Sequence, residues 1–156
     1  MKLWIDSREK PQAIEKILAW FDNHGIEWEK KKLDTGDYMM EGKPDIVVDR
    51  KGDLLELAHN MLTADKARFY REIRRARDAG IHLIILCEHG GIHGLEDVKK
   101  WKPKFGRSSG KKLADAIFRL EIAYGTPTLF CDPRSTGRRI VEILTSGGGE
   151  DGIQNK

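Results

Sequence analysis

The sequence has only two cysteines among its 156 residues, too few to hold a fold together with disulfides. Cys87 and Cys131 each follow an apolar run, which predicts two reduced thiols buried at the ends of strands. No stretch is long and apolar enough to span a membrane, and the first ten residues lack the apolar core of a signal peptide. We therefore expect an intracellular protein, cytoplasmic or nucleoid-associated, with no membrane partner.

The chain also lacks a large excess of charge of either sign, since 28 Lys and Arg face 25 Asp and Glu, for a net charge of +3. The overall balance therefore does not identify a partner, and any nucleic-acid surface must be found in local clusters. Hydrophobic residues make up 39% of the sequence, enough for one ordinary globular domain of this length.

Apolar periodicity predicts alternating helices and strands. Apolar residues at helical spacing, or on most faces of a segment, predict helices over 11–24, 54–62, 65–79, 109–124 and 133–144. Alternating or continuous apolar residues predict strands at 2–5, 26–33, 38–40, 45–50, 83–87 and 126–131. The order is one strand, one helix, three strands in a meander, and then helices alternating with strands. This order predicts an α/β sandwich with a central mixed β-sheet flanked by helices. The element type of 88–108 stays open, and 147–156 is expected to be a disordered tail after a single domain spanning 1–146.

Three charged side chains, those of Asp37, Asp49 and Lys51, lie near the ends of two predicted strands and form a candidate catalytic group. Asp49 and Lys51 project from one face of a strand, and Arg50 projects from the other. Asp37 opens the preceding strand, so an antiparallel pairing would bring both carboxylates and the amine to one point. Two carboxylates suit Mg²⁺, and a nearby lysine can orient water or stabilise developing charge during phosphodiester hydrolysis. The simpler alternative is a surface salt bridge between Asp49 and Lys51.

The surroundings of this group carry a more specific signal. The segments are Ile-Asp-Ser-Arg-Glu at 5–9, Gly-Asp-Tyr at 36–38, Val-Val-Asp-Arg-Lys at 47–51, Arg-Phe-Tyr-Arg-Glu at 68–72 and Leu-Ile-Ile-Leu-Cys-Glu at 83–88. In order and spacing they resemble the XPF-type nuclease family of excision-repair and branched-DNA endonucleases. The resemblance covers about residues 3–145 and implies the restriction-endonuclease-like fold, a three-layer α/β sandwich.

The resemblance also implies roles for individual residues. Asp37 and Asp49 would bind Mg²⁺ or Mn²⁺, and Lys51 would be the catalytic lysine. Asp6 and Arg50 would complete the catalytic group. The rim and substrate-positioning residues would be Arg8, Glu9, Arg68 and Glu72.

Two positions depart from the family pattern. The family usually has Glu where this chain has Asp49, a change that keeps the carboxylate but shortens the side chain. The family often has an acid where this chain has Leu55, and Asp53 and Glu56 are the neighbouring candidates to replace it. The number of metal ions is therefore left open.

Two basic segments are candidates for DNA contact. Residues 99–112 carry seven positive charges and no acid, and lysines in such a segment can neutralise phosphates. Trp101 and Phe105 lie among them, either to stack on unpaired bases or to pack inward. The expected DNA-binding residues are Lys99, Lys100, Lys102, Lys104, Arg107, Lys111 and Lys112, with Arg71 and Arg75 from the second segment.

Two other patterns are weak. Residues 106–112 superficially resemble a phosphate-binding loop, but the glycine spacing is wrong and no hydroxyl residue follows the lysine. Cys87, His89 and His93 suggest zinc ligands, but the sequence offers no evident fourth ligand.

The sequence thus favours a divalent-metal-dependent DNA endonuclease acting on branched or flapped DNA. A catalytically silent relative that binds branched DNA or supports an active partner is the main alternative, and an unrelated small α/β binding module is the third. We expect a homodimer, with Phe118, Ile122 and Ile143 as exposed apolar contacts. The chain is expected to lack helicase and helix-hairpin-helix domains, so that substrate choice comes from this domain, a second copy or another protein.

Overall fold

The computed structural model describes residues 1–104 and 109–146 of the chain. The expected disordered tail at 147–156 lies outside the described residues, as do Phe105 and Arg107.

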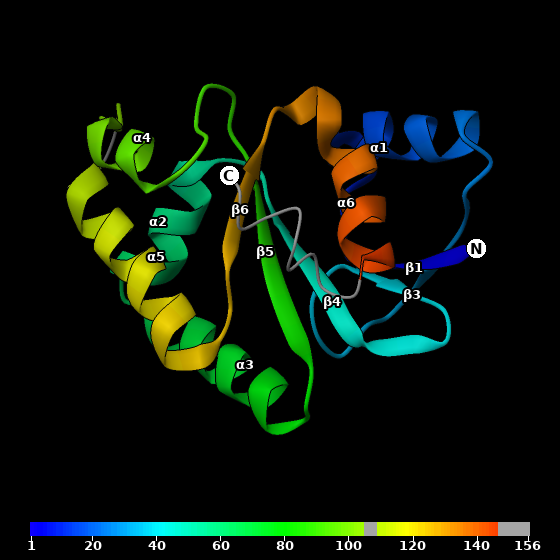
Figure 1. Cartoon of the computed structure of the whole chain (residues 1–156), viewed down its shortest axis with the longest axis horizontal. Coiled ribbons are helices and arrows are strands. Elements are labelled where there is room, and N and C mark those ends of the chain that lie inside the picture. The colour runs from blue at the N-terminus through cyan, green and yellow to red at the C-terminus, as the bar shows by residue number, and fades with distance from the viewer. Residues whose placement is uncertain (105–108, 147–156) are drawn as a thin grey trace.

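A six-stranded mixed sheet forms the centre of the molecule, in the order β2-β1-β3-β4-β5-β6 (Figure 1). Only β3 runs antiparallel to its neighbours β1 and β4. The other neighbouring pairs, β1 with β2, β4 with β5 and β5 with β6, are parallel. The strands are β1 (Lys2–Asp6), β2 (Glu27–Lys31), β3 (Tyr38–Met40), β4 (Lys43–Lys51), β5 (His82–Glu88) and β6 (Thr128–Cys131).

Helices cover both faces of this sheet. One layer contains α1 (Pro11–Asn23) and α6 (Thr136–Thr145), which follows a short 3-10 turn at Pro133–Ser135. The opposite layer contains α2 (Leu54–Leu62), α3 (Lys66–Asp78), α4 (Leu95–Lys100) and α5 (Gly110–Tyr124). The predicted three-layer α/β sandwich with a central mixed sheet is confirmed.

Side-chain alternation along β4 divides the core in two. Val47 packs with α2, α3 and α5, whereas Ile46 and Val48 pack with α1 and α6. Residues beyond Val48 continue this alternation toward the end of the strand. Asp49 and Lys51 therefore share the α3 face, and Arg50 lies on the α1 and α6 face.

The predicted meander of three strands was wrong. β2 does not pair with β3 but lies at the sheet edge, parallel to β1, to which it is connected through α1. Alternation of side chains in 27–31 showed that this segment was a strand, but it could not show which strand it joined. The predicted adjacency of β3 and β4 is confirmed.

The structure also tests the sequence predictions for one open segment, one apolar side chain and the two cysteines. The segment left open at 88–108 contains α4. Ile143, expected to be exposed, is buried at 1% exposure because α6 packs its apolar stripe onto the sheet. Cys87 and Cys131 are free and buried, as predicted. None of the described helices has the length and apolar character needed to cross a membrane.

Candidate active site

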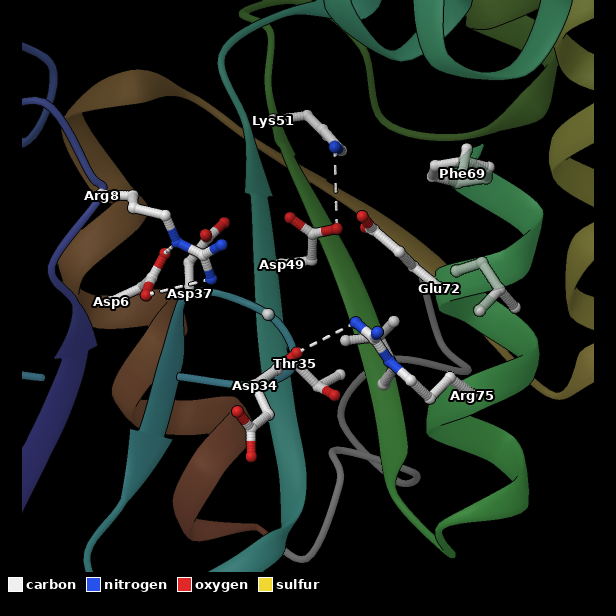
Figure 2. A pocket seen from close by; sticks show the side chains of 13 residues that line it. Asp6, Arg8, Asp34, Thr35, Asp37, Asp49, Lys51, Phe69, Glu72 and Arg75 are labelled. Atoms are coloured by element: carbon white, nitrogen blue, oxygen red, sulfur yellow. Dashed lines mark hydrogen bonds and ion pairs between the residues drawn. The ribbon is translucent and has the colours of Figure 1, made fainter. Parts of the chain in front are cut away.

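A polar pocket opens on the α3 face of the sheet, between the carboxyl-terminal part of β4 and helix α3 (Figure 2). Five segments contribute to it: the end of β1 with the turn that follows, the loop before β3, β4, α3 and the start of β5. Its polar and charged lining residues, with one aromatic ring, are Asp6, Arg8, Asp34, Thr35, Asp37, Asp49, Lys51, Phe69, Glu72 and Arg75.

Gly36 allows the chain to turn closely over β4 before β3 begins. Its φ of +69° lies in the left-handed region, and a Cβ there would come within 2.2 Å of Val47 Cγ1. The next residue is fixed by two backbone contacts. The Asp37 N–H donates to the Val48 carbonyl at 2.8 Å, and the Arg50 N–H donates to the Asp37 carboxylate at 2.8 Å. The turn therefore holds the Asp37 carboxylate against the end of β4.

Asp37 and Asp49 form a crowded carboxylate pair. Burial and the negative charge of Asp49 raise the pKa of Asp37 well above its ordinary value of 3.8. Two carboxylates held together in a partly buried position repel each other, and a divalent cation bound between them would relieve this repulsion. The described residues contain no group of three or more His, Cys, Asp or Glu side chains around one point. A cation here would therefore complete its coordination with water and substrate oxygens.

Lys51 lies beside this pair. Its Nζ is 3.6 Å from an Asp49 carboxylate oxygen and 5.7 Å from the centre of the Phe69 ring. The Lys51 and Asp49 side chains are only 11% and 19% exposed, so the contact is not an ordinary surface salt bridge. The structure thus brings together the three residues that the sequence singled out.

Asp6 and Arg8 form one wall of the pocket. Asp6 is 3% exposed, and its carboxylate accepts from the Arg8 guanidinium at 2.9 and 3.3 Å and from the Leu33 N–H at 3.0 Å. Both oxygens are thus engaged, so Asp6 holds Arg8 and the 33–37 loop in place. The Arg8 side chain is 63% exposed at the lip of the pocket, where a substrate phosphate can reach it.

Helix α3 supplies the opposite wall. Glu72 points toward Asp49, and Arg75 donates to the Asp34 carbonyl at 3.3 Å (Figure 2). Arg68 was expected to face the site, but its guanidinium is paired with Asp65 near the start of the helix and does not line the pocket. Arg75, expected only to bind DNA, lies within the pocket itself.

Arg50 and Glu9 do not line the pocket, although both were expected at the site. Their side chains pair at 2.7 Å on the opposite face of β4, where Arg50 also contacts Glu88. Alternation along β4 places Asp49 and Lys51 toward α3 and so turns Arg50 away. Only the backbone N–H of Arg50 reaches the site, through Asp37.

The candidate replacements for the missing acid are engaged elsewhere. Asp53 accepts from the Glu56 N–H at 2.8 Å and Glu56 accepts from the Gly52 N–H at 2.8 Å, which together cap the start of α2. Neither carboxylate lines the pocket. The position of Leu55 is therefore not compensated by these two neighbours.

The zinc alternative gains no support from the geometry of the described segments. Cys87 is fully buried, and the His89 Nδ1 accepts a hydrogen bond from the Leu54 N–H at 3.0 Å. No third ligand joins these residues within ranges 1–104 and 109–146.

The described residues of the basic segment, 99–104 and 109–112, do not line the pocket. Trp101 packs inward against the core and meets the His89 ring edge-on at 6.3 Å between centroids, so it is not free to stack on a base. Lys99 is paired with Glu96 at 2.8 Å. The other lysines are exposed, namely Lys100, Lys102, Lys104, Lys111 and Lys112, whereas the expected Arg107 lies outside the described residues.

Among the polar and aromatic pocket residues, three were not anticipated from the sequence. Asp34 and Thr35 directly precede the Gly-Asp-Tyr segment, so their position next to that motif was an available signal. Phe69 was assigned to the core stripe of its helix, and it does pack there while its ring borders Lys51. Its place in the apolar stripe of the helix predicts only a core residue, so the sequence does not reveal that it also borders the pocket.

Comparisons with known proteins identify the family and the fold. The sequence matches the ERCC4 domain family over residues 5–142. The fold is similar to that of XPF from Aeropyrum pernix, with a TM-score of 0.70, 19% identity, and coverage of 99% of this chain and 69% of that one. A second structure, XPF from Aeropyrum pernix in complex with DNA, gives a TM-score of 0.69 at 19% identity, covering 94% and 64%. The comparison with curated proteins gave no match. At these identities the two structures establish the likeness of the fold.

Proposed function

This chain belongs to the ERCC4 domain family and has the fold of an XPF-type nuclease domain, and on that premise we propose that it is a divalent-metal-dependent DNA endonuclease. The observation that carries the proposal is the partly buried Asp37–Asp49 pair with Lys51 beside it. A silent relative has no need to keep two repelling carboxylates and a lysine buried together.

Asp37 and Asp49 are the residues that would hold the cation, Mg²⁺ or Mn²⁺. Their oxygen donors and their mutual repulsion fit such an ion. When bound, it would supply positive charge beside the phosphoryl oxygens and make a nearby water more acidic.

Lys51 would act on the reacting groups directly. It lies within the pocket and is held by Asp49 on one side and the Phe69 ring on the other. From there it can orient the attacking water or stabilise negative charge that develops on the phosphate. Arg8 and Arg75 stand on opposite walls and can each bind a neighbouring phosphate of the same strand.

Double-stranded or branched DNA would contact the pocket and exposed basic residues of α3, α4 and α5. Arg71 and Arg74 are exposed on α3, and exposed lysines flank α4 and the start of α5. One of the structures with this fold is described as a complex with DNA, which supports the same partner here. The family resemblance favours branched or flapped substrates.

The experiment that tests the proposal measures cleavage of a panel of labelled flap, fork, junction and duplex DNAs, with Mg²⁺, with Mn²⁺ and with EDTA. Asp49→Asn keeps the shape of the side chain but makes it a poor cation ligand. Lys51→Ala removes the amine. Each should reduce cleavage at least about 100-fold, the usual effect of losing one stabilising group. Asp45→Asn is the matched control, since Asp45 is an exposed residue of the same strand.

Folding and DNA binding should survive in both variants, because neither side chain belongs to the apolar core. Equal cleavage by wild type and Asp49→Asn would show that this site is wrongly assigned. If wild type binds branched DNA but never cuts it with any divalent metal, the silent-partner alternative holds.

A further inference from the structure

The face of β4 opposite the pocket carries a buried cluster of charged side chains. Arg50 lies between Glu9 and Glu88, donating to Glu9 at 2.7 Å and contacting the Glu88 carboxylate. All three side chains are 10% exposed or less. Glu9 also accepts from the Tyr38 hydroxyl at 3.0 Å, and Glu88 accepts from the Thr136 hydroxyl at 2.5 Å. We call these five residues the far-face cluster.

The far-face cluster joins parts of the chain that are distant in sequence. Glu9 lies in the loop after β1, Tyr38 opens β3, and Arg50 lies near the end of β4. Glu88 ends β5, and Thr136 begins α6. The guanidinium therefore ties the end of β4 to the segments that flank it on both sides.

Stability alone does not account for such a cluster. Burying two carboxylates around one guanidinium carries a desolvation penalty that apolar side chains of similar size would not have. Burial would lower the pKa of Arg50, but its hydrogen bonds and ion pairs with Glu9 and Glu88 outweigh this and raise that pKa. The cluster is thus a fixed charged unit whose geometry is specified by directional hydrogen bonds.

The backbone links this unit to the pocket. Arg50 stands between Asp49 and Lys51, so fixing its side chain on one face fixes the direction of its neighbours on the other. Its own N–H donates to the Asp37 carboxylate at 2.8 Å. All three pocket residues that define the candidate site are therefore adjacent to, or bonded to, a single clamped residue.

We propose that Glu9, Arg50 and Glu88 are positioning residues, which set the geometry of the Asp37, Asp49 and Lys51 site from the opposite face of the sheet. The inference rests on the proposed function, because it concerns the same site. Supporting groups behind ligands commonly change metal affinity or activity by about 10–100-fold when replaced.

Arg50→Lys is the first test. Lysine keeps the charge but has no planar fork, so it cannot hold both carboxylates in the same way. We expect the affinity for Mn²⁺, measured by electron paramagnetic resonance without DNA, to fall by about 10-fold or more. The turnover number should fall as well, whereas DNA affinity measured in Ca²⁺ should stay unchanged.

Glu88→Gln is the second test and disturbs the fold less. Its amide can still accept from Arg50 and donate to the Thr136 hydroxyl, but the charge is gone. We expect Mn²⁺ affinity and the turnover number to fall in this variant, as in Arg50→Lys. Because both residues act through one unit, the Arg50→Lys/Glu88→Gln double variant should lose less than the two separate losses would predict.

Arg139→Lys is the matched control. Arg139 lies on α6, is 15% exposed and pairs with Glu142 at 2.8 Å, and among the described residues no hydrogen bond or ion pair joins its side chain to the far-face cluster. This variant should match wild type in Mn²⁺ affinity and turnover. If Arg50→Lys fails to fold, Glu88→Gln decides the question by itself.

Wild-type Mn²⁺ affinity and turnover in a folded Arg50→Lys or Glu88→Gln protein would overturn the positioning role while leaving the proposed function intact. A wild-type chain that neither binds Mn²⁺ nor cuts DNA would instead overturn the proposed function, and this inference with it. An equal loss in Arg139→Lys would show that the effect is general destabilisation and would also overturn the positioning role.

Discussion

The proposed function requires Asp37 in its charged form, because it would hold a cation. Burial and the negative charge of Asp49 both oppose its ionisation. Replacing it with Asn keeps an oxygen that can accept from the Arg50 N–H at the same place. We expect Asp37→Asn to abolish metal-dependent cleavage and to raise the unfolding temperature of the metal-free protein near neutral pH. Such a trade between activity and stability is common at functional sites.

The stability gained in Asp37→Asn should depend on pH, because the pKa of the wild-type Asp37 carboxyl is raised on folding. Because the pKa of Asp37 is raised on folding, the folded state binds more protons than the unfolded state above the ordinary value of 3.8. The metal-free wild type therefore loses stability as pH rises from that value through the raised pKa. Thermal melts in EDTA should show the advantage of Asp37→Asn growing over this window, and a constant difference at all pH values would contradict it.

Gly36 is a second residue whose identity the site requires. Gly36→Ala would place a Cβ at 2.2 Å from Val47 Cγ1 in addition to the strain of a positive φ. Gly42→Ala is the matched control, since Gly42 has a φ of +86° but nothing within 4 Å of an added Cβ. We expect the control to lose about 1 kcal/mol from left-handed strain and Gly36→Ala to lose about 1–3 kcal/mol more from overpacking. Urea unfolding of both variants measures the difference, and equal losses would contradict the close approach.

The placement of site residues could be predicted from the sequence where they alternate along one strand. Asp49 and Lys51 could be placed together, and Arg50 on the other side, from alternation alone. The partners of Arg50 could not be predicted, because Glu9 and Glu88 are distant in sequence and meet it only once the sheet order is fixed. Asp6, predicted as a catalytic residue, does line the pocket, and the sequence did not reveal that its carboxylate would bind the Arg8 guanidinium.

Among the elements, those with a strong local pattern were predicted most closely. The apolar run in 83–87 and the stripes of 65–79 and 109–124 led directly to β5, α3 and α5. The order of β2 in the sheet was not predictable in the same way, because pairing depends on a crossover and not on the strand's own residues. Helix α4 was missed because six residues give too short a period to recognise.

The exposed lysines around α4 make a prediction about DNA binding. Lys100, Lys102 and Lys104 are exposed, and Trp101 anchors this segment to the core. Replacing all three with Ala should weaken binding to every DNA sequence and reduce the slope of log affinity against log salt by about 0.9 for each lost phosphate contact. Titrations by fluorescence anisotropy at several salt concentrations measure this slope.

A matched set of lysines on other elements controls for the change of net charge. Lys16, Lys30 and Lys43 lie on α1, β2 and the start of β4, away from α4. Their triple replacement should leave the slope nearly unchanged. If both triple variants reduce it equally, net charge rather than a local surface determines binding, and the α4 segment is only a solvated part of the molecule.

On the surface of the whole molecule, helix α5 exposes two large apolar side chains. Phe118 and Ile122 are 55% and 70% exposed and lie one helical turn apart. Elsewhere in the described segments, the large apolar side chains with comparable exposure are Met1 and Leu55, which lie on other elements. A paired patch with an aromatic residue is a suitable centre for a symmetric contact between two copies, in which the same face meets itself.

We therefore expect the protein to form a homodimer through α5. Phe118→Asp combined with Ile122→Asp should convert it to a monomer without lowering the intrinsic stability of the domain, because neither side chain contributes to its core. Leu55→Asp, a charge placed on another exposed apolar position, should leave the dimer intact. Light scattering across a concentration series measures both. A wild-type monomer at high micromolar concentration would rule out this contact, and the proposed DNA cleavage would then need no second copy of the chain.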